Sequence, residues 1–442
     1  YFSLRNAVGA TQEYQLSHSI REDEVPSLGE MHRATLARTS QLMLKRAVGA
    51  QQVNAVFTFR QVDNLQALAT KREESLMGRL DWQGSWLKKV LRSDLTYAVS
   101  NGRELKRTYA FVQVPAGQGT HTWRDDNHDG KPDINEFYEA INFDEKNYIK
   151  VYLPGTDFVP AYSNLVNFRL AMEAPAFWKQ GQGLRRALSR LSANHVLLSD
   201  NKVTDDALHA RLLSALLPVE GSQLLAGKQS LRSMIFFNRA NPVFGADVIF
   251  NRNNNKRMLS QGMESLSTQS AGMVIRYNAG PEQMWRLSTE QGRRAAASDF
   301  MAGRTYDVAY RMIAPEWAWQ PGTSFRASWK FTWQQRTGSP VSGESVHAAQ
   351  REWSTDARWN KTAGSSFQAV IRLIDIDYDG ERNTALGYEM LNALNPGRNY
   401  TWTVNAVHKL VNGIQINLNY EGRKSPGAST VHVGRVMVTA LF

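Results

Sequence analysis

The chain has 442 residues, of which 42% are hydrophobic, and it contains no cysteine, which excludes disulfides, thiolate metal sites and a cysteine nucleophile. Its formal net charge is +11. Apart from 182–191 and 253–258, Lys and Arg are spread singly rather than gathered in a phosphate-binding stripe, so we expect no nucleic-acid partner.

Alternation of apolar and polar residues begins near residue 31 and recurs along the chain. In 324–336, for example, Phe325, Trp329 and Trp333 share one face, while Arg326 and Lys330 share the other. Period-two patterns over about ten residues predict β-strands of the length that crosses a bilayer. Such strands are predicted at 31–46, 51–62, 75–86, 91–101, 103–114, 162–174, 183–198, 229–238, 243–253, 262–277, 281–293, 300–313, 324–336, 346–360, 364–378, 400–410, 414–421 and 431–442.

The connections between these strands fall into a short and a long set. Asn-Gly pairs at 101–102 and 412–413 predict two-residue hairpins, because both central residues of a type I′ turn need positive φ. If the last strand runs towards the periplasm, the short turns 101–102, 239–242, 278–282, 361–365 and 412–413 all fall on the periplasmic side. The long segments 115–161, 199–228, 337–345 and 379–397 then fall outside, as in outer-membrane barrels.

These patterns predict an all-β fold, a transmembrane antiparallel β-barrel of about 16–20 strands with long extracellular loops. The barrel is expected to span 1–442, with loop insertions at 115–161 and 199–228. A soluble sandwich or propeller is the alternative. The chain starts without an initiator Met or signal peptide, so we expect it to be the C-terminal domain of a longer chain.

A calcium-loop pattern, "DDNHDGKPDINE", lies within the segment 115–161. Calcium takes six to eight oxygen ligands, and the Gly at position six, Gly130, permits the sharp bend of the loop. The pattern predicts a Ca²⁺ site, and the alternative is a polar turn that binds no metal. The predicted ligands are Asp125, Asn127, Asp129, Lys131, Asp133 and Glu136.

Two further segments carry local predictions. A short helix is expected within 204–218, where Leu208, Leu212 and Leu216 follow helical spacing. No zinc-protease His spacing and no G-x-S-x-G elbow is present in the sequence, so we predict that the protein is not an enzyme.

Four stretches resemble the C-terminal half of large, mostly uncharacterised outer-membrane proteins of Bacteroidota. They are "TWRDDNHDGKPDINEF", "NKRMLSQGMES", "ALGYEMLNALNPGRNYTW" and "LNYEGRKS…VHVGRVMVTALF". The C-terminal aromatic, preceded by apolar residues at alternate positions, also resembles the signal that hands outer-membrane proteins to the barrel assembly machinery. The residues of this predicted assembly signal are Gly434, Val436, Val438, Ala440 and Phe442.

The resemblance implies a bacterial outer-membrane protein with extracellular long loops and a periplasmic C-terminus. Its expected partners are outer-membrane lipids and lipopolysaccharide, the barrel assembly machinery, and other outer-membrane proteins or lipoproteins. We expect an anchoring or scaffold subunit of a larger complex for protein assembly or secretion. The alternative is a porin-like or uptake channel, in which inward Lys and Arg side chains would make a basic lumen.

Overall fold

A computed structural model describes residues 1–6, 12–27, 30–65, 71–105, 108–126, 128–153, 158–217, 223–259, 262–299, 301–340, 343–361, 364–410 and 413–440. In these ranges the chain forms 23 strands. Nineteen belong to one antiparallel sheet and four to a small second sheet. No helix within these ranges is both long and apolar enough to cross a membrane. The predicted all-β antiparallel fold class is confirmed, and the nineteen strands of the large sheet fall within the predicted 16–20.

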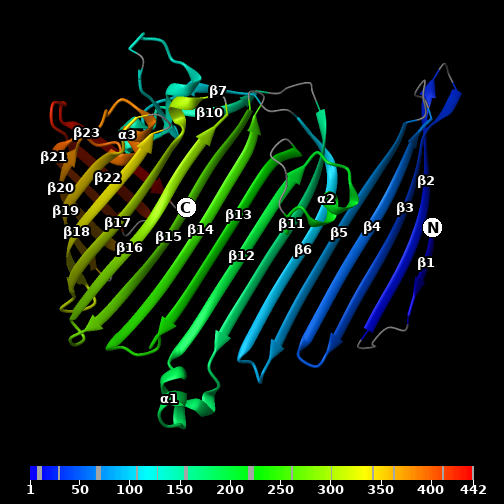
Figure 1. The fold of residues 1–442 in the computed structure, drawn as a ribbon, viewed down its shortest axis with the longest axis horizontal. Helices are drawn as coiled ribbons and strands as arrows, with labels where there is room; N and C mark the ends of the chain where they lie inside the picture. The colour runs from blue at the N-terminus through cyan, green and yellow to red at the C-terminus, as the bar shows by residue number, and fades with distance from the viewer. Residues whose placement is uncertain are drawn as a thin grey trace. The chain divides into compact units, whose positions relative to one another are not determined.

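The chain divides into two compact units. Unit 1 comprises 1–106, 155–235 and 252–263, and unit 2 comprises 107–154, 236–251 and 264–442. In unit 1 each strand pairs with the next along the sheet, β6 pairing with β11 (Figure 1). Its elements are β1 (Phe2–Arg5), β2 (Gln12–Ser27), β3 (Glu30–Val48), β4 (Gln51–Asn64), β5 (Lys71–Trp86), β6 (Leu91–Leu105), β11 (Phe158–Glu173), η3 (Ala176–Gln180), α1 (Leu184–Leu188), β12 (Leu191–Val203) and α2 (Leu208–Leu213).

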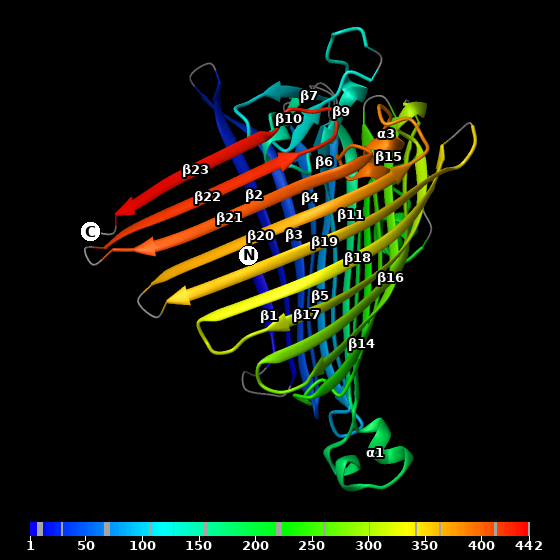
Figure 2. The same ribbon diagram turned by 90° about the vertical axis from the view of Figure 1, so that its left-hand side faces the viewer.

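Two strands have residues in both units, β13 (Leu224–Phe237) and β14 (Phe244–Leu259). Unit 2 continues as an antiparallel ladder from β15 to β23, seen from green to red in Figure 2. Its elements are β15 (Gly262–Asn278), β16 (Gln283–Ser298), η5 (Ala302–Arg304), β17 (Tyr306–Trp319), β18 (Phe325–Pro340), β19 (Val346–Lys361), β20 (Ser365–Tyr378), α3 (Ala385–Leu391), β21 (Gly397–Lys409), β22 (Ile414–Lys424) and β23 (Val431–Ala440).

The small sheet belongs to unit 2 and is built from the segment between β6 and β11. Its strands are β7 (Thr108–Gln113), β8 (His121–Trp123), β9 (Phe137–Glu139) and β10 (Tyr148–Leu153), in the order β7-β10-β8-β9. Two short 3-10 turns, η1 (Ile134–Glu136) and η2 (Phe143–Glu145), connect them. Thus the predicted insertion 115–161 holds a folded module, and its last residues, from Phe158, already belong to β11.

In both units the strands have a turn end, with mostly short connections, and a loop end, with mostly long ones. Segments 239–242 and 278–282 connect strands at turn ends, as predicted, while parts of the predicted turns 361–365 and 412–413 lie outside the described residues. α2 and α3 lie in loop-end connections, since β12 ends at Val203 and β13 begins at Leu224, while β20 and β21 flank α3. The long connection at a turn end, 174–190, holds α1.

The predicted hairpin at Asn101-Gly102 is wrong, because both residues lie inside β6 and pair with Tyr162 and Ala161 of β11. On its other side, β6 pairs with β5 only from Val99 towards Leu91. Beyond that point the Asn101 side chain takes the place of a backbone partner, accepting from the Leu76 N–H at 2.5 Å and donating to the Glu74 carbonyl at 2.6 Å. The chain reverses instead at 87–90.

The strand prediction at 183–198 is wrong at its start, because α1 occupies Leu184–Leu188 and β12 begins at Leu191. The helix predicted within 204–218 is confirmed as α2. It packs on β6 and β11, where Tyr97 donates to the Leu212 carbonyl at 2.5 Å and buried Asn164 donates to the same carbonyl. Ala210 of this helix forms a buried cluster with Val203 and Leu224.

Candidate functional site

The sheet of unit 2 has two chemically different faces. Register places Thr332 opposite Glu352, Ser354 opposite Arg372, and Thr403 opposite Glu421, so one face is polar from strand to strand. The opposite, apolar face carries an aromatic row in which Trp317 and Trp329 stack with ring centroids 4.7 Å apart. This alternation confirms the sequence prediction for 324–336 and 414–421, and it separates a water-compatible surface from one suited to lipid.

α3 lies on the polar face of β17 to β20 and converts part of that face into a local core. Thr384 caps its first turn by accepting the Gly387 N–H at 2.9 Å, and Asn392 ends it in the left-handed conformation with φ of 51°. Leu386 and Met390 pack against Val308 and Ala348, while Leu391 packs against Ile374 and Ile376. Gly338 makes this close approach possible, because an added Cβ would meet Leu386 at 2.7 Å.

Partly buried charged side chains hold the carboxyl end of α3. Arg336 donates to the carbonyls of Glu389 and Met390 at 2.9 and 2.8 Å, which satisfies acceptors that the helix leaves free. The Glu389 carboxylate lies 3.0 Å from Arg294 and accepts from Tyr306 at 3.3 Å. Such charge-assisted contacts fix the helix in one position, so α3 is a rigid part of the polar face.

The small sheet is attached to the same loop end of unit 2. Arg304 donates to the Phe137 carbonyl at 2.6 Å, and Tyr388 of α3 donates to the Glu139 carbonyl at 2.9 Å. Burial raises the pKa of Tyr388 to about 12, so its hydroxyl keeps the donated proton at neutral pH. Arg423 of β22 lies 2.7 Å from Asp144 and 2.9 Å from Glu145 of η2.

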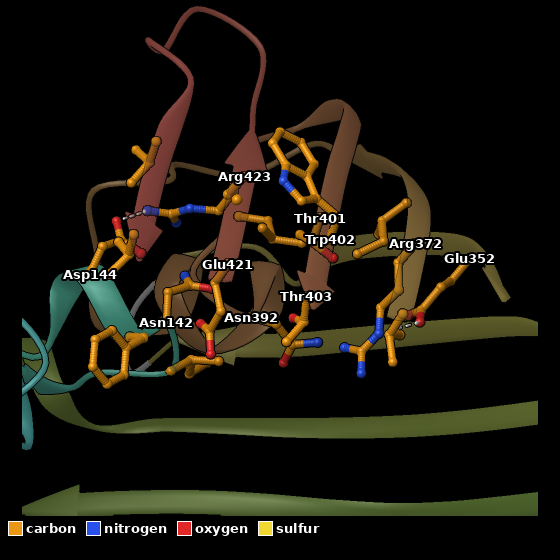
Figure 3. Close-up of a pocket in the computed structure, with 18 of the residues that line it drawn as sticks. Asn142, Asp144, Glu352, Arg372, Asn392, Thr401, Trp402, Thr403, Glu421 and Arg423 are labelled. Atoms are coloured by element: carbon orange, nitrogen blue, oxygen red, sulfur yellow. Dashed lines mark hydrogen bonds and ion pairs between the residues drawn. The ribbon is translucent and has the colours of Figure 1, made fainter. Parts of the chain in front are cut away.

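A cavity of about 360 Å³ remains between these parts (Figure 3). Its wall combines side chains of β19 to β23 with segment 141–144 of the small sheet and the residues after α3. Glu352 and Arg372 lie 3.8 Å apart on one side, and Asp144 and Arg423 form an ion pair on the other. The Glu421 side chain lies between them, and its carboxylate makes no hydrogen bond or ion pair to any residue that the structure describes. Further polar lining comes from Asn142, Gln350, Asn392, Thr401 and Thr403.

Sequence reasoning placed these polar residues on alternate strand positions but did not bring them together as a site. The contributing strands pair in order from β19 to β23, yet the segment that closes the cavity comes from residues 141–144, far earlier in the chain. The folding of α3 onto the polar face was also not predicted. Its signal was present, since Thr384 is a favourable N-cap and Leu386, Met390 and Leu391 have helical spacing.

The structure places the described residues of the calcium pattern in a tight turn. Asp125 accepts the N–H groups of Asp129 and Gly130 at 3.1 and 3.0 Å, and Asp129 accepts the Lys131 N–H at 2.7 Å. Gly130 has a φ of 72°, a conformation that a side chain would strain. Asn127 lies outside the described residues.

Glu136, expected to supply two oxygens, is buried and turned elsewhere. One of its oxygens accepts from the Trp123 indole at 2.8 Å and from the Asp133 N–H at 3.2 Å. Across the described ranges, no three His, Asp or Glu side chains converge as a metal cluster. Asp125 and Asp129 therefore suit a cation, whereas Glu136 would have to rotate to join them, and the Ca²⁺ site stays a prediction.

The predicted assembly signal occupies the apolar face of β23. Val436 pairs with Leu418, Val438 with Ile416, and Gly434 with Tyr420. Val436 and Val438 are 64% and 63% exposed, so this face has no protein partner among the described residues. Ala440 pairs with Ile414, and Phe442 lies outside the described part of the chain.

Neither a protein-family model nor a curated protein matches the chain. It is similar to the crystal structure of OccK3 (OpdO) from Pseudomonas aeruginosa, with 10% sequence identity and a TM-score of 0.37 over 97% of this chain and 92% of that one. It is also similar to OccAB4 of Acinetobacter baumannii, with 8% identity and a TM-score of 0.32 over 97% and 96% of the two chains. For the RagAB peptide transporter the identity is 9% and the TM-score 0.26, over 92% of this chain and 51% of that one.

The resemblance to outer-membrane proteins of Bacteroidota stays a prediction.

Proposed function

We propose that the chain forms a closed β-barrel in the bacterial outer membrane and acts as a channel for small hydrophilic solutes. The observation that supports closure is the two-faced antiparallel sheet of long strands. In a bilayer a sheet edge would leave backbone groups without partners, so a sheet with one lipid-compatible face must close on itself. The polar face, with its charged side chains, then lines the interior.

The cavity beside α3 carries the channel proposal. α3 and segment 141–144 narrow the path along the polar face without removing its polar lining, because Arg372, Thr403 and Glu421 still face the open space. Such a fixed constriction with charges of both signs selects solutes by size and charge. The long loops are proposed to be extracellular and the C-terminus periplasmic, since short turns are typical of the periplasmic side.

The scaffold role and its partners among outer-membrane proteins and lipoproteins remain predictions from sequence. The two roles differ in a measurable way. A channel gives steady single-channel currents when the purified protein is inserted into planar bilayers. A scaffold gives none and instead copurifies with fixed partners.

The sharpest test removes single charges at the constriction and measures the ion selectivity of the channel. In a KCl gradient, Glu421→Gln should shift the reversal potential towards anions, because it removes a carboxylate with no described counter-ion. Arg372→Gln should shift it towards cations. Glu344→Gln, at an exposed loop-end position, is the matched control and should leave it unchanged. A reversal potential that is unchanged by both cavity substitutions would contradict the proposal, as would the absence of any current.

A further inference from the structure

Two neighbouring connections at the turn end of unit 1 are strongly basic. β6 pairs with both β5 and β11, so the turn 87–90 and the segment 174–190 lie side by side, and the Glu173 N–H donates to the Val90 carbonyl at 2.9 Å. We call their six basic residues the basic patch. They are Lys88, Lys89, Lys179, Arg185, Arg186 and Arg190.

The positive charge of the basic patch is uncompensated. All six side chains are exposed, and none forms an ion pair with a residue that the structure describes. The sequence has no Asp or Glu between Asp81 and Asp94, or between Glu173 and Asp200. Glu173, which precedes the segment 174–190 in the sequence, lies 2.6 Å from Arg92 and is therefore already paired.

Large apolar side chains project from the same two connections. Leu87 is 70% exposed, Phe177 62% and Leu184 75%. The turn that presents Leu87 and its two lysines holds three successive residues at positive φ, 51°, 56° and 71°, although none is Gly. Exposed apolar residues interleaved with Lys and Arg are typical of segments that bind at the interface of an anionic membrane.

An aromatic pair fixes the level of the patch along the strands. Trp82 and Trp86 lie on one face of β5 with ring centroids 5.1 Å apart, and Trp86 is the last residue of that strand. Trp side chains concentrate at the headgroup level of membranes. Lys88 and Lys89 lie two and three residues after Trp86, so in the membrane placement proposed above they leave the sheet at the level of lipid phosphates.

We propose that the basic patch binds the headgroups of anionic phospholipids in the leaflet at this end of the strands, with Leu87, Phe177 and Leu184 entering the interface. This inference rests on the membrane placement given under the proposed function. The apolar tips favour a lipid surface over an acidic protein, because a headgroup layer offers both phosphates and hydrocarbon within a few ångströms. The segment 174–190 thereby acts as an anchor rather than as a loop that lines the channel.

The test measures lipid selectivity of the purified full chain. The protein is incubated in detergent with equal amounts of phosphatidylglycerol and phosphatidylcholine, and the lipids that stay bound are counted by native mass spectrometry. The unaltered chain should retain phosphatidylglycerol in preference. The variant Arg185→Gln/Arg186→Gln/Arg190→Gln should lose this preference by about tenfold or more, since each basic residue near an anionic surface contributes about fivefold.

A matched control removes the same charge elsewhere in unit 1. Lys228, Arg252 and Lys256 are exposed basic residues of β13 and β14, and their triple change to Gln should keep the preference. Equal retention by both triple variants would overturn the proposal, as would binding of an acidic polypeptide by a chain that shows no lipid preference. Conductance is recorded on the same variants, so a failure of the channel proposal is seen separately from a failure of lipid binding.

Discussion

Single glycine residues decide where another element can pack closely on this sheet. Gly338 and Gly102 both lie in strands, but an added Cβ at Gly338 would meet Leu386 at 2.7 Å and Met390 at 3.0 Å, whereas at Gly102 it would meet nothing within 4 Å. The difference arises because α3 covers β18 while no element covers Gly102 in the described structure. At Gly338 the glycine is therefore required because another element packs directly on the backbone.

Replacing Gly338 by Val should displace α3. The added side chain overpacks the contact with Leu386, a change that costs about 1–3 kcal/mol in well-packed sites. We expect faster hydrogen exchange of 385–391 and a lower midpoint of thermal unfolding in detergent. Gly102→Val is the matched control and should leave both measurements close to those of the unaltered chain. Unchanged exchange in Gly338→Val would show that α3 does not depend on this contact.

At the level of elements, most of the strands could be predicted from sequence because one face of each is apolar and the other is polar. Period-two alternation reports that difference directly, as in β18 and β22. It fails where the chemistry of the two faces is not distinct or the signal is ambiguous. The Asn101-Gly102 pair is typical of a hairpin turn, yet the Asn101 amide substitutes for a backbone partner inside β6. The true turn, 87–90, contains neither Gly nor Asn.

The candidate site could not be assembled from sequence because its parts meet only through tertiary contacts. The polar side chains of β20 to β22 follow from alternation, but nothing local indicates that segment 141–144 lies opposite them. That juxtaposition depends on Arg423 reaching Asp144 and Glu145, and on Tyr388 reaching the Glu139 carbonyl. Contacts between residues hundreds of positions apart leave no periodic trace in the chain.

The predicted calcium site in the loop 125–136 can be tested directly by terbium luminescence. Trp123 donates to Glu136 at 2.8 Å, so its indole would lie beside an ion held in 125–136. Terbium added to the purified chain should give emission excited through Trp123, and calcium should displace it with a Kd of roughly 10⁻⁴–10⁻³ M. Glu136→Gln should weaken this competition strongly, while Lys131→Gln, which removes no side-chain ligand, serves as the control. An absence of sensitised emission would leave the loop as a metal-free turn.

On the scale of the whole molecule, the net charge of +11 is unevenly distributed. On the polar face, Arg294 pairs with Glu389, and Arg423 pairs with both Asp144 and Glu145, so these arginines add little to the net charge. The six residues of the basic patch at the turn end of unit 1 are exposed and form no ion pair with a described residue, so they contribute their full charge. This part of the net charge therefore lies on a surface suited to lipid phosphates.

The final prediction concerns how such a sheet reaches its membrane. The apolar face of β23, with Val436 and Val438 beside Leu418 and Ile416, continues the alternation that ends at Phe442. If the terminal aromatic is read by the assembly machinery, Phe442→Ala should lower the amount of protein in the outer membrane several-fold and increase its degradation in the periplasm. Thr439→Ala, on the opposite face of β23, is the control and should insert normally. Quantitative blots of separated membranes give the comparison. Equal levels of the two variants would show that Phe442 is not the recognised residue, and equal thermal midpoints of the inserted proteins would confirm that the substitution acts on assembly rather than on stability.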